Sequence, residues 1–425
     1  MGCHMGLPNM NKTNQLSNPP KTQTQMPTKP DEKTSKLSRR AAIRLAGVST
    51  AAVAGNLYFN SSVHAAGSDI LSRTVISHTP ELYCGWPTLT RCKNGQLLIV
   101  WSGGREEHVC PFGRVEMMRS NDEGKTWSWP RTIHDSAIDD RDAGILETNQ
   151  GTLLVTTFSS LAYQAGLEKA IRDHASGNSP WEDSKRARWL AAHNRVDEET
   201  RRQELGQWML RSTDGGLSWS TRYRCPVNSP HGPIQLNDGS LLYSGVQLWD
   251  PGRRVGVCQS TDDGISWQWL SDIPVRTEDQ SKEYHELHSV QCASGKILTH
   301  IRNHNANASR ETLQCESTDG GKTWTTPHSI GVWGLPSFLL RLKSGRILMS
   351  YGYRRAPFGN QARYSDDEGS TWSDPITISD DGAGGDLGYP STVELSDGSL
   401  LTVWYERLKG NNHAVLRQAH WRIND

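Results

Sequence analysis

The fold of this chain is decided by Ser120-Asn121-Asp122-Glu123-Gly124-Lys125-Thr126-Trp127, because the pattern Ser-x-Asp-x-Gly-x-Ser/Thr-Trp occurs five times. The other copies are 212–219, 260–267, 317–324 and 365–372. Recurrence at roughly even intervals indicates one structural unit repeated in an array. The Asp carboxylate can accept backbone N–H groups in a tight turn, the Gly supplies a positive φ angle, and the Trp packs beneath the turn. We therefore interpret this Ser-x-Asp motif as a hairpin turn between two outer strands, with a scaffold role.

A second repeat, a turn ending in Gly before an apolar run, occurs six times. Its glycines are Gly95, Gly151, Gly239, Gly295, Gly345 and Gly398. Each copy is a hairpin signal, and the first five each precede a Ser-x-Asp motif. A β-propeller repeats four-stranded blades and closes its ring to hide the strand edges. Six copies therefore predict an all-β, six-bladed β-propeller of four-stranded antiparallel blades over 66–425, closed by 413–423 completing a sheet begun near Thr74–Ser77.

One segment interrupts the repeat in the second blade. Residues 162–204 are rich in Ala, Glu, Arg and Lys and lack strand alternation, while Trp181, Trp189 and Leu190 offer an apolar face. This composition predicts a helical insertion of one or two helices. Two interpretations stay open at this point, a lid over a central site and a solvated decoration.

The N-terminal region has the composition of a targeting segment. Residues 1–37 are polar and rich in Pro, Thr, Asn and Lys, which predicts a disordered extension. Arg39 and Arg40 precede the small and apolar run 45–59, and 63–65 offers small residues for cleavage. Residues 38–65 therefore predict a twin-arginine-type signal and export to the periplasm or the cell exterior.

Composition limits the partners. The chain has 46 Lys and Arg and 46 Asp and Glu, so its formal net charge is zero and there is no electrostatic case for nucleic acid. Nothing after the N-terminal region is apolar enough to span a bilayer. Cys92 and Cys292 occupy equivalent repeat positions, as do Cys258 and Cys315, which favours packing over a disulfide framework. We expect a monomer without a cofactor.

The repeat itself locates a candidate site. Nine residues before each hairpin Gly, at the start of each blade's innermost strand, the six copies carry Trp86, Asp142, Pro230, Glu286, Pro336 and Tyr389. Ionisable side chains of different kinds at one repeat position indicate a shared pocket at one mouth of the channel. Seven residues after the Gly, only Arg302 is charged, and antiparallel pairing places it beside Glu286. Nearby offsets add Arg105, His231, His304, Arg354, Arg355 and Glu406.

At these residues the chain resembles the sialidase (neuraminidase) superfamily. The stretch from Glu286 to Arg302 is similar to the family segment that holds the glutamate partner of the nucleophile and one substrate-binding arginine. Gly388-Tyr389-Pro390-Ser391 resembles the segment with the nucleophilic tyrosine, and 229–233 resembles the third-blade segment. The resemblance implies a secreted exo-acting glycoside hydrolase on a glycan substrate with a terminal acidic sugar, retaining, with Tyr389 as nucleophile, Glu286 as its base and Arg302 on the substrate carboxylate. Arg354 or Arg355 would be the second clamp.

The chain departs from the family pattern at two positions. Trp86 stands where the family carries an arginine, and the following connection, 103–108, has no Asp for the acid/base role. Glu106, Glu107, His108 and Asp142 are the candidates for the acid, and Arg105 is a candidate for the missing positive charge. The sugar itself is therefore left open.

Two other functions remain at this stage. His231, Tyr389 and Arg302 would suit a propeller polysaccharide lyase acting on uronates, in which His and Tyr remove the proton while Arg neutralises the acid. A non-catalytic glycan-binding propeller is the third alternative. A metal site at His285 and His288 is not expected, because strand neighbours three residues apart point to opposite faces.

Overall fold

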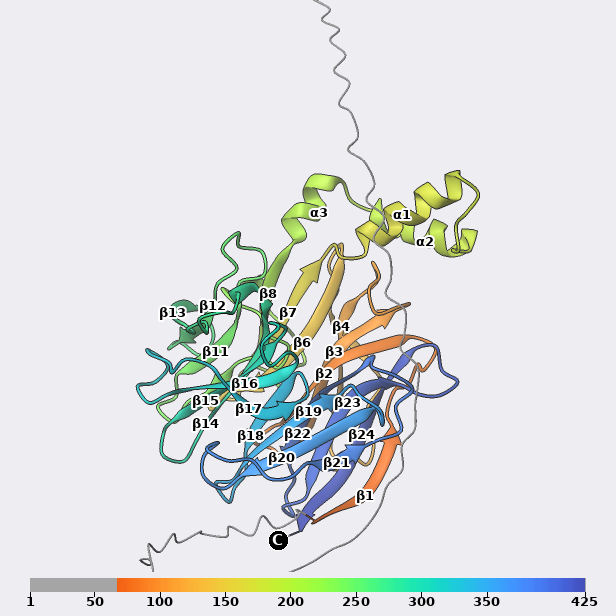
Figure 1. Cartoon of the computed structure of the whole chain (residues 1–425). Coiled ribbons are helices and arrows are strands. Elements are labelled where there is room, and N and C mark those ends of the chain that lie inside the picture. The colour runs from red at the N-terminus through yellow and green to blue at the C-terminus, as the bar shows by residue number, and fades with distance from the viewer. Residues whose placement is uncertain (1–66, 425) are drawn as a thin grey trace, which may run out of the picture. The chain divides into compact units, whose positions relative to one another are not determined.

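The computed structural model describes residues 67–424, so the predicted extension (1–37) and signal segment (38–65) lie outside the described residues. The described chain forms six four-stranded antiparallel sheets (Figure 1). Each sheet follows the order of its strands along the chain, except the last, whose order is β1-β24-β23-β22. The predicted six-bladed propeller is confirmed.

The strands fall into blades at the predicted intervals. Blade 1 holds β2 (Tyr83–Arg91), β3 (Leu97–Arg105), β4 (Arg114–Ser120) and β5 (Arg131–His134). Blade 2 holds β6 (Asp139–Glu147), β7 (Leu153–Ser160), β8 (Gly206–Ser212) and β9 (Tyr223–Arg224). Blade 3 holds β10 (Ile234–Gln235), β11 (Leu241–Val246), β12 (Val255–Ser260) and β13 (Gln268–Asp272). Blade 4 follows a short 3-10 helix, η1 (Ser281–Glu283), and holds β14 (Tyr284–Gln291), β15 (Ile297–Asn303), β16 (Glu311–Ser317) and β17 (His328–Trp333). Blade 5 holds β18 (Ser337–Arg341), β19 (Ile347–Tyr353), β20 (Gly359–Ser365) and β21 (Ile376–Ser379).

Blade 6 closes the ring with strands from both ends of the described chain. It consists of β22 (Leu387–Glu394), β23 (Leu400–Arg407), β24 (Ala414–Asn424) and β1 (Gly67–Val75). Strand β1 pairs with β24 from Gly67–Asn424 to Val75–Arg417, with one bulge. The predicted closure is confirmed, and the outer strand begins at Gly67, earlier than expected. Because β1 covers the edge of β24, the C-terminal strand is not an open edge.

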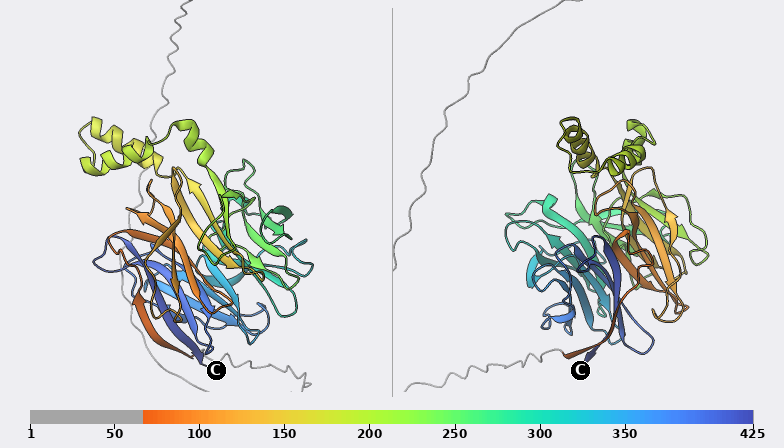
Figure 2. Two further views of the ribbon diagram at one scale, coloured as in Figure 1. Left: turned by 180° about the vertical axis from the view of Figure 1, so that it is seen from behind. Right: turned by 90° about the vertical axis from the view of Figure 1, so that its right-hand side faces the viewer.

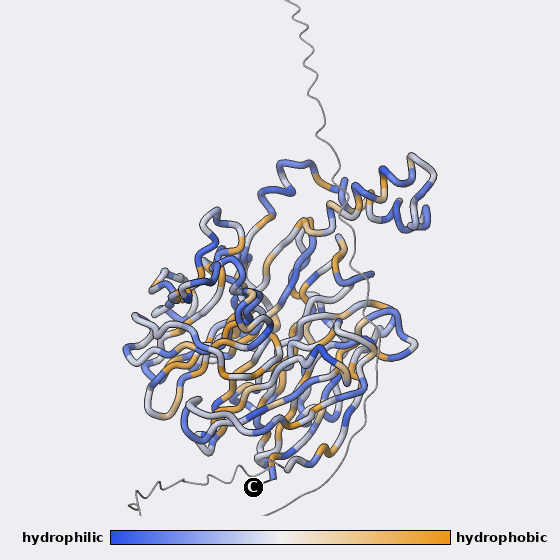
Figure 3. The backbone as a smooth tube through the Cα atoms, viewed as in Figure 1, coloured by the Kyte–Doolittle hydropathy of each residue, from blue (hydrophilic) through white to orange (hydrophobic). Residues whose placement is uncertain are grey.

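Apolar clusters join neighbouring blades around the ring. One cluster joins blades 1 and 6, from Trp101 to Val403, and another joins blades 3 and 4, from Val257 to Ile301. The remaining four blade interfaces have clusters of the same kind. Figure 3 shows the apolar stretches along the strands and the mostly hydrophilic helices. Burial of apolar area between blades is therefore the main stabilisation of the ring.

The Ser-x-Asp motifs form the turns between the third and fourth strands, as predicted. In the first copy, Asp122 Oδ1 accepts from Thr126 N at 2.9 Å, and Ser120 Oγ accepts from Gly124 N at 2.9 Å. Gly124 has φ +84°, and a Cβ there would lie 2.6 Å from Leu401 in the hairpin repeat of blade 6. The two sequence repeats therefore contact each other across blade boundaries.

Three helices form the insertion in blade 2. They are α1 (Gln164–Ala175), α2 (Asp183–His193) and α3 (Glu198–Glu204), and they project beyond the ends of the strands (Figure 2). Trp189 of α2 is buried against Tyr163, Leu167 and Cys110, the last from blade 1. None of the helices between residues 67 and 424 has the length and apolar character that a bilayer crossing needs.

Candidate functional site

Three innermost strands share an unusual backbone conformation at the predicted position. Trp86, Asp142 and Tyr389 have φ angles of 54°, 47° and 53°, in the left-handed region that side chains other than Gly rarely occupy. At each of them the pairing register with the second strand shifts. Such bulges redirect a side chain out of the strand alternation, and strained residues concentrate at functional sites.

These bulges surround one cavity of about 380 Å³ at the strand-start end of the channel. We call it the arginine-lined cavity, because four arginines from four blades border it. Its charged and aromatic lining consists of Arg141, Arg253, Arg302, Arg354, Asp142, Glu286, His108, His285, Trp86, Phe158, Tyr389 and Tyr405. Four guanidinium groups against two carboxylates favour an anionic ligand over a cationic one.

Tyr389, Glu286 and Arg302 form the centre of the cavity. The Tyr389 hydroxyl donates to Glu286 Oε1 at 2.7 Å. Arg302 Nη1 donates to both Glu286 oxygens at 2.9 and 2.8 Å and to Tyr389 Oη at 3.0 Å. The sequence offsets thus brought together three side chains from blades 4 and 6.

The electrostatics of this centre fix which of the two groups holds the proton in the resting site. Burial and the Glu286 carboxylate raise the pKa of Tyr389 well above its ordinary value, so the phenol keeps its proton. Burial opposes ionisation of Glu286, but Arg302 outweighs it and lowers the pKa of Glu286 to about 2. A protonated phenol therefore donates to an ionised carboxylate, which is the arrangement that a base-assisted nucleophile needs.

Asp142 is the second carboxylate of the cavity. It is 6% exposed, and one of its oxygens, Oδ1, is buried without a hydrogen-bond partner among the described residues. Burial raises the pKa of Asp142 to about 7, against the opposing attraction of Arg141. Two carboxyl groups in one cavity with pKa values moved in opposite directions fit two roles, one as base and one as acid.

Two guanidinium groups lie over the ring of Trp86. The Arg141 guanidinium lies 4.5 Å from its ring centroid and borders the cavity, while that of Arg105 lies 5.0 Å away. Arg105 itself is fully buried and paired with Asp139 at 2.6 Å. Arg105 is therefore outside the cavity lining, and Arg141 is the cation that Trp86 presents to the cavity.

Several sequence-predicted residues lie away from the cavity. Glu107 pairs with Lys185 of α2, and Glu106 accepts from Arg188 Nε at 2.8 Å, so both attach the insertion to blade 1. Arg355 is exposed and stacks on Trp333 at 3.7 Å. Of the two alternative clamps, only Arg354 borders the cavity.

His304 and Glu406 contact other protein groups. Arg302 Nε donates to His304 Nε2 at 2.9 Å, so His304 orients the guanidinium without bordering the cavity. Burial and Arg302 lower the pKa of His304 to about 4, which keeps the acceptor neutral. Glu406 is buried and paired with Arg417.

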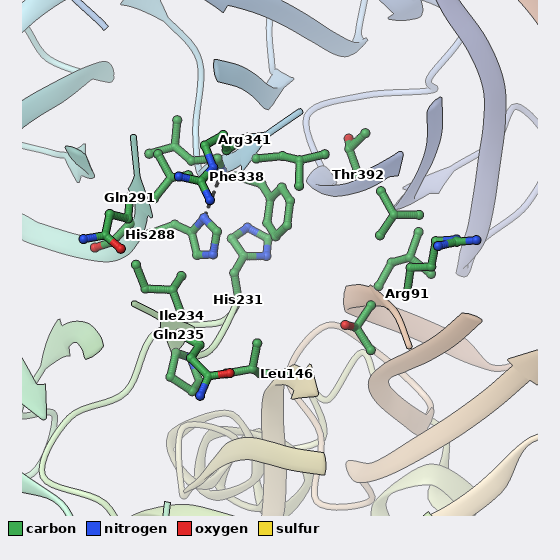
Figure 4. A pocket seen from close by; sticks show the side chains of 18 of the residues that line it. Arg91, Leu146, His231, Ile234, Gln235, His288, Gln291, Phe338, Arg341 and Thr392 are labelled. Carbon is green, nitrogen blue, oxygen red and sulfur yellow. Dashed lines mark hydrogen bonds between the residues drawn. The ribbon is translucent and has the colours of Figure 1, made fainter. Parts of the chain in front are cut away.

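His231 borders a different cavity. This second cavity, of about 440 Å³, lies toward the other ends of the innermost strands and is shown in Figure 4 with His231, His288 and Phe338 together. The His288 and Phe338 rings stack at 4.5 Å. Burial lowers the pKa of His231 to about 3. His231 is therefore outside the lining of the arginine-lined cavity, although its ring centroid lies 6.2 Å from that of Tyr389.

The sequence analysis missed Arg141 and Arg253. Arg141 precedes Asp142, and strand alternation would send it to the other face, but the bulge lets both neighbours border the cavity. Arg253 lies in the loop between β11 and β12, where no repeat position exists to compare. The Nε atoms of both arginines are buried without a partner among the described residues. A search for arginines next to the repeat position would have found Arg141.

Glu283, His285 and His304 have the spacing of a metal site, since their ligand atoms lie within 4.8 Å of one another. Arginine donors already occupy a nitrogen of each ring, however. Arg253 Nη2 lies 3.2 Å from His285 Nδ1, and Arg302 Nε lies 2.9 Å from His304 Nε2. A neutral imidazole has one lone pair, so the other nitrogen of each ring carries a proton. While these contacts persist, neither ring has a lone pair for a cation.

The borders of the helical insertion decide between the two interpretations of its role. Of residues 162–204, only Ala162, at the foot of the insertion, borders the arginine-lined cavity. The helices instead contact the blade 1 connection through Glu106 and Glu107. The insertion is therefore attached at the rim, and within 162–204 its contact with the cavity lining is at Ala162.

Comparisons with known proteins agree with the fold. The family of BNR repeat-like domains matches residues 185–402, just over half of the chain. A curated protein named sialidase from Bacteroides fragilis (strain YCH46) is 24% identical over 357 residues, which is 75% of this chain and 59% of that protein. The chain thus spans less than two thirds of that relative.

Solved structures show the same architecture. A protein of unknown function from Dyadobacter fermentans DSM 18053 matches with a TM-score of 0.68 at 23% identity, over 84% of this chain and all of that chain. The Hadza microbial sialidase Hz136 matches with a TM-score of 0.56 at 17% identity, over 79% of this chain and 65% of that chain. The NanB sialidase from Streptococcus pneumoniae matches with a TM-score of 0.57 at 15% identity, over 82% of this chain and 70% of that chain. At such identities these matches establish the fold and leave the activity open.

Proposed function

Since the chain belongs to the family of BNR repeat-like domains, we propose that it is a retaining glycoside hydrolase that removes a terminal acidic sugar from a glycan. The observation that carries the proposal is the 2.7 Å hydrogen bond from the Tyr389 hydroxyl to Glu286 in a cavity bordered by four arginines. A phenol is a suitable nucleophile for such a sugar, because a carboxylate nucleophile would repel the substrate's own carboxylate.

Each residue has a defined task in the proposed reaction. The Tyr389 oxygen attacks the anomeric carbon while its proton passes to Glu286, and Asp142 protonates the departing glycosidic oxygen. Water then attacks the carbon of the glycosyl–tyrosine intermediate, Asp142 takes a proton from that water, and the phenol regains its proton from Glu286. The pKa of about 7 for Asp142 suits both a proton donor and a proton acceptor near neutral pH.

The arginines bind the acidic group of the sugar in this proposal. Arg302 already donates from Nε and Nη1 to protein groups, so Nη2 is the nitrogen that remains for a ligand among the contacts of the described residues. Within residues 67–424, Arg354 donates a hydrogen bond from Nε to Leu387 O, at 3.0 Å, and its guanidinium lies 5.8 Å from the Tyr389 ring. Arg141, held on Trp86, supplies a third cation from another direction.

An assay with matched tyrosine variants tests the proposal. The protein is incubated with aryl glycosides of sialic acid, other nonulosonic acids and uronic acids, and the released acidic sugar is measured. Tyr389→Phe is expected to lower kcat roughly a thousandfold or more, because Phe has no oxygen to attack. Tyr364→Phe, in outer strand β20, is the control and is expected to keep full activity.

Other outcomes of this assay would contradict the proposal. An unsaturated product would indicate a lyase, and binding of an acidic glycan without any turnover would indicate a binding propeller. Full activity of the Tyr389→Phe protein on a substrate that wild type cleaves would exclude the nucleophile assignment.

Export is a second proposal, which rests on sequence alone. Arg39 and Arg40 before an apolar run support a twin-arginine-type signal over 38–65. Replacing both arginines by lysine is expected to retain the protein inside the cell, as measured by immunoblots of cell fractions. Undiminished export of that variant would contradict the proposal.

A further inference from the structure

His108 lies at the rim of the arginine-lined cavity. It belongs to the connection between β3 and β4, borders the cavity, and has a side chain that is 46% exposed. Its ring stands edge-on to Trp86, with the centroids 4.9 Å apart. None of the tasks assigned to Tyr389, Glu286 and Asp142 uses this imidazole.

One nitrogen of His108 is fixed by a carboxylate. Nδ1 lies 3.0 Å from Asp386 Oδ1 and 2.8 Å from Tyr83 Oη. Tyr83 and Tyr405 also donate to Asp386 Oδ1, at 2.9 and 3.3 Å. Burial opposes ionisation of Asp386, but the hydrogen bond from His108 and those from the tyrosines hold its pKa below the ordinary value. Because an ionised carboxylate only accepts hydrogen bonds, the proton of the imidazole is on Nδ1.

The other nitrogen of His108 is available to a ligand. Nε2 has no hydrogen-bond partner within residues 67–424, and when the ring holds a single proton, on Nδ1 beside Asp386, Nε2 carries a lone pair. The nearby Asp386 charge disfavours an anion at this place and favours a group that donates a hydrogen bond. A hydroxyl group has that property.

The helical insertion holds the two residues that precede His108. Glu106 accepts from Arg188 Nε and from Trp189 Nε1, both at 2.8 Å, and Glu107 pairs with Lys185. The three donors belong to α2. Since Ala162 also borders the cavity, the insertion contributes one part of the rim directly and fixes another part through its salt bridges.

We propose that His108, oriented by Asp386 and by α2, accepts a hydrogen bond from a hydroxyl of the neutral sugar to which the acidic sugar is attached. The rim beside the insertion is then the leaving-group subsite, while the arginines deeper in the cavity bind the acidic ring. This inference rests on the proposed function. It makes His108 a specificity-determining residue and gives the insertion a role in substrate choice.

Two donors of the same acidic sugar separate a contact with the leaving sugar from a contact with the acidic ring. One donor carries the acidic sugar on a neutral hexose, and the other is the glycosyl fluoride, which has no leaving sugar. His108→Gln is expected to lower kcat/KM for the hexose-linked donor roughly tenfold and to change the fluoride less than about twofold. Asp386→Asn is expected to lower kcat/KM for the hexose-linked donor as well, because it removes the charge that holds the proton of His108 on Nδ1.

A matched histidine variant completes the kinetic test. His328→Gln, in outer strand β17 where the ring pairs with Glu316, is expected to leave both donors unchanged. Equal losses on both donors in the His108→Gln protein, or no loss on either, would overturn the proposed subsite. Failure of wild type to cleave any acidic donor would instead overturn the proposed function.

A binding experiment tests the subsite without turnover. Histidine ring resonances are followed by NMR while a neutral hexose is added, and the His108 signal is assigned by its absence from the His108→Gln protein. A saturable shift of that signal is expected. If the His108 resonance does not move while the protein is folded, the subsite is excluded whatever the protein's activity.

Discussion

Asp142 combines a strained backbone, burial and a raised pKa in one residue. Its φ of 47° is tolerated better by Asp and Asn than by most side chains, so the bulge at the start of the strand limits which residue types fit at position 142. Ionisation of Asp142 in the folded protein is opposed by burial, and Oδ1 has no partner among the described residues. A residue of this kind lowers stability and is retained where chemistry needs it.

Asp142→Asn is expected to stabilise the protein at alkaline pH. A carboxyl whose folded pKa is about 7 and whose unfolded pKa is 3.8 binds its proton more tightly when folded, so its stabilising contribution is complete below pH 3.8 and is lost as the pH rises to about 7. The neutral amide avoids this loss, and the gain at pH 8 is expected to be up to about 4 kcal/mol, with little gain near pH 4. Urea unfolding at the two pH values measures it.

The activity of wild type has a matching pH dependence. Because Asp142 must be protonated to act as the acid, kcat/KM for a sugar-linked substrate is expected to fall as the pH rises through about 7. The glycosyl fluoride, whose leaving group needs no proton, is expected to lack this decrease in the glycosylation step. A descending limb of equal size for both donors would contradict the assignment of Asp142.

Sequence reasoning at this scale succeeded where a residue shares a repeat position with its counterparts. Trp86, Asp142, Glu286 and Tyr389 were found by counting back from the hairpin glycines, and all four border one cavity. It failed for Arg141, since alternation along a strand assumes a regular backbone and the left-handed bulge at the next residue breaks that assumption. The acidic pair at 106–107 is outside the cavity lining and is bonded to α2, a tertiary contact that no local pattern encodes.

At the scale of elements, the two repeats depend on each other. A Cβ on Gly264, in the third Ser-x-Asp motif, would lie 2.7 Å from Leu154, which follows the hairpin glycine of blade 2. Gly321 and Leu242 have the same relation across the next boundary, at 2.6 Å. The motif therefore needs its glycine for the positive φ and also for the close approach to the preceding blade.

A pair of glycine variants separates these two needs. Gly239 has φ +88° with open space around the Cβ direction, whereas Gly264 has φ +79° and meets Leu154. Gly239→Ala is expected to cost roughly 1 kcal/mol of unfolding free energy, from backbone strain alone. Gly264→Ala is expected to cost about 2–4 kcal/mol, because overpacking is added. If denaturant unfolding shows the same loss of unfolding free energy for both variants, the contact between the repeats does not contribute to stability.

The sequence predicted that the insertion is helical, but it did not predict where the helices attach to the propeller. Composition and missing alternation were enough to identify helices within 162–204. The choice between a lid and a rim attachment depended on where Trp189 is buried and which carboxylates α2 binds. These contacts join residues about 80 positions apart in sequence, so they could be seen only in the folded chain.

At the scale of the whole molecule, closure gathers the site. Tyr389 and Glu286 are separated by 103 residues, and the ring brings them within hydrogen-bond distance. Repeats predicted the six blades and their closure by β24 because a propeller has one way to hide its edges. They did not predict the depth of the pocket or the second cavity at the other end of the channel.

Removal of the closing strand tests that view of the ring. A chain that begins at residue 76 lacks β1 and leaves the edge of β24 unpaired. A chain that begins at residue 66 keeps β1 and its pairing with β24. The shorter chain is expected to have a Tm lower by a few degrees and to associate with rising concentration, because the open edge can pair with another copy. Calorimetry and light scattering measure these effects, and identical behaviour of the two chains would contradict them.

The central claim is that Tyr389 attacks the anomeric carbon of an acidic sugar. An analogue of that sugar with fluorine on the carbon next to the anomeric carbon and with a fluoride leaving group forms the glycosyl–enzyme bond faster than water breaks it. The intermediate then accumulates and can be located by peptide mass spectrometry. The account predicts one added sugar on the peptide that contains Tyr389 and none in the Tyr389→Phe protein. A sugar attached to Glu286 or Asp142, or turnover of the acidic substrate without any trapped intermediate, would contradict it.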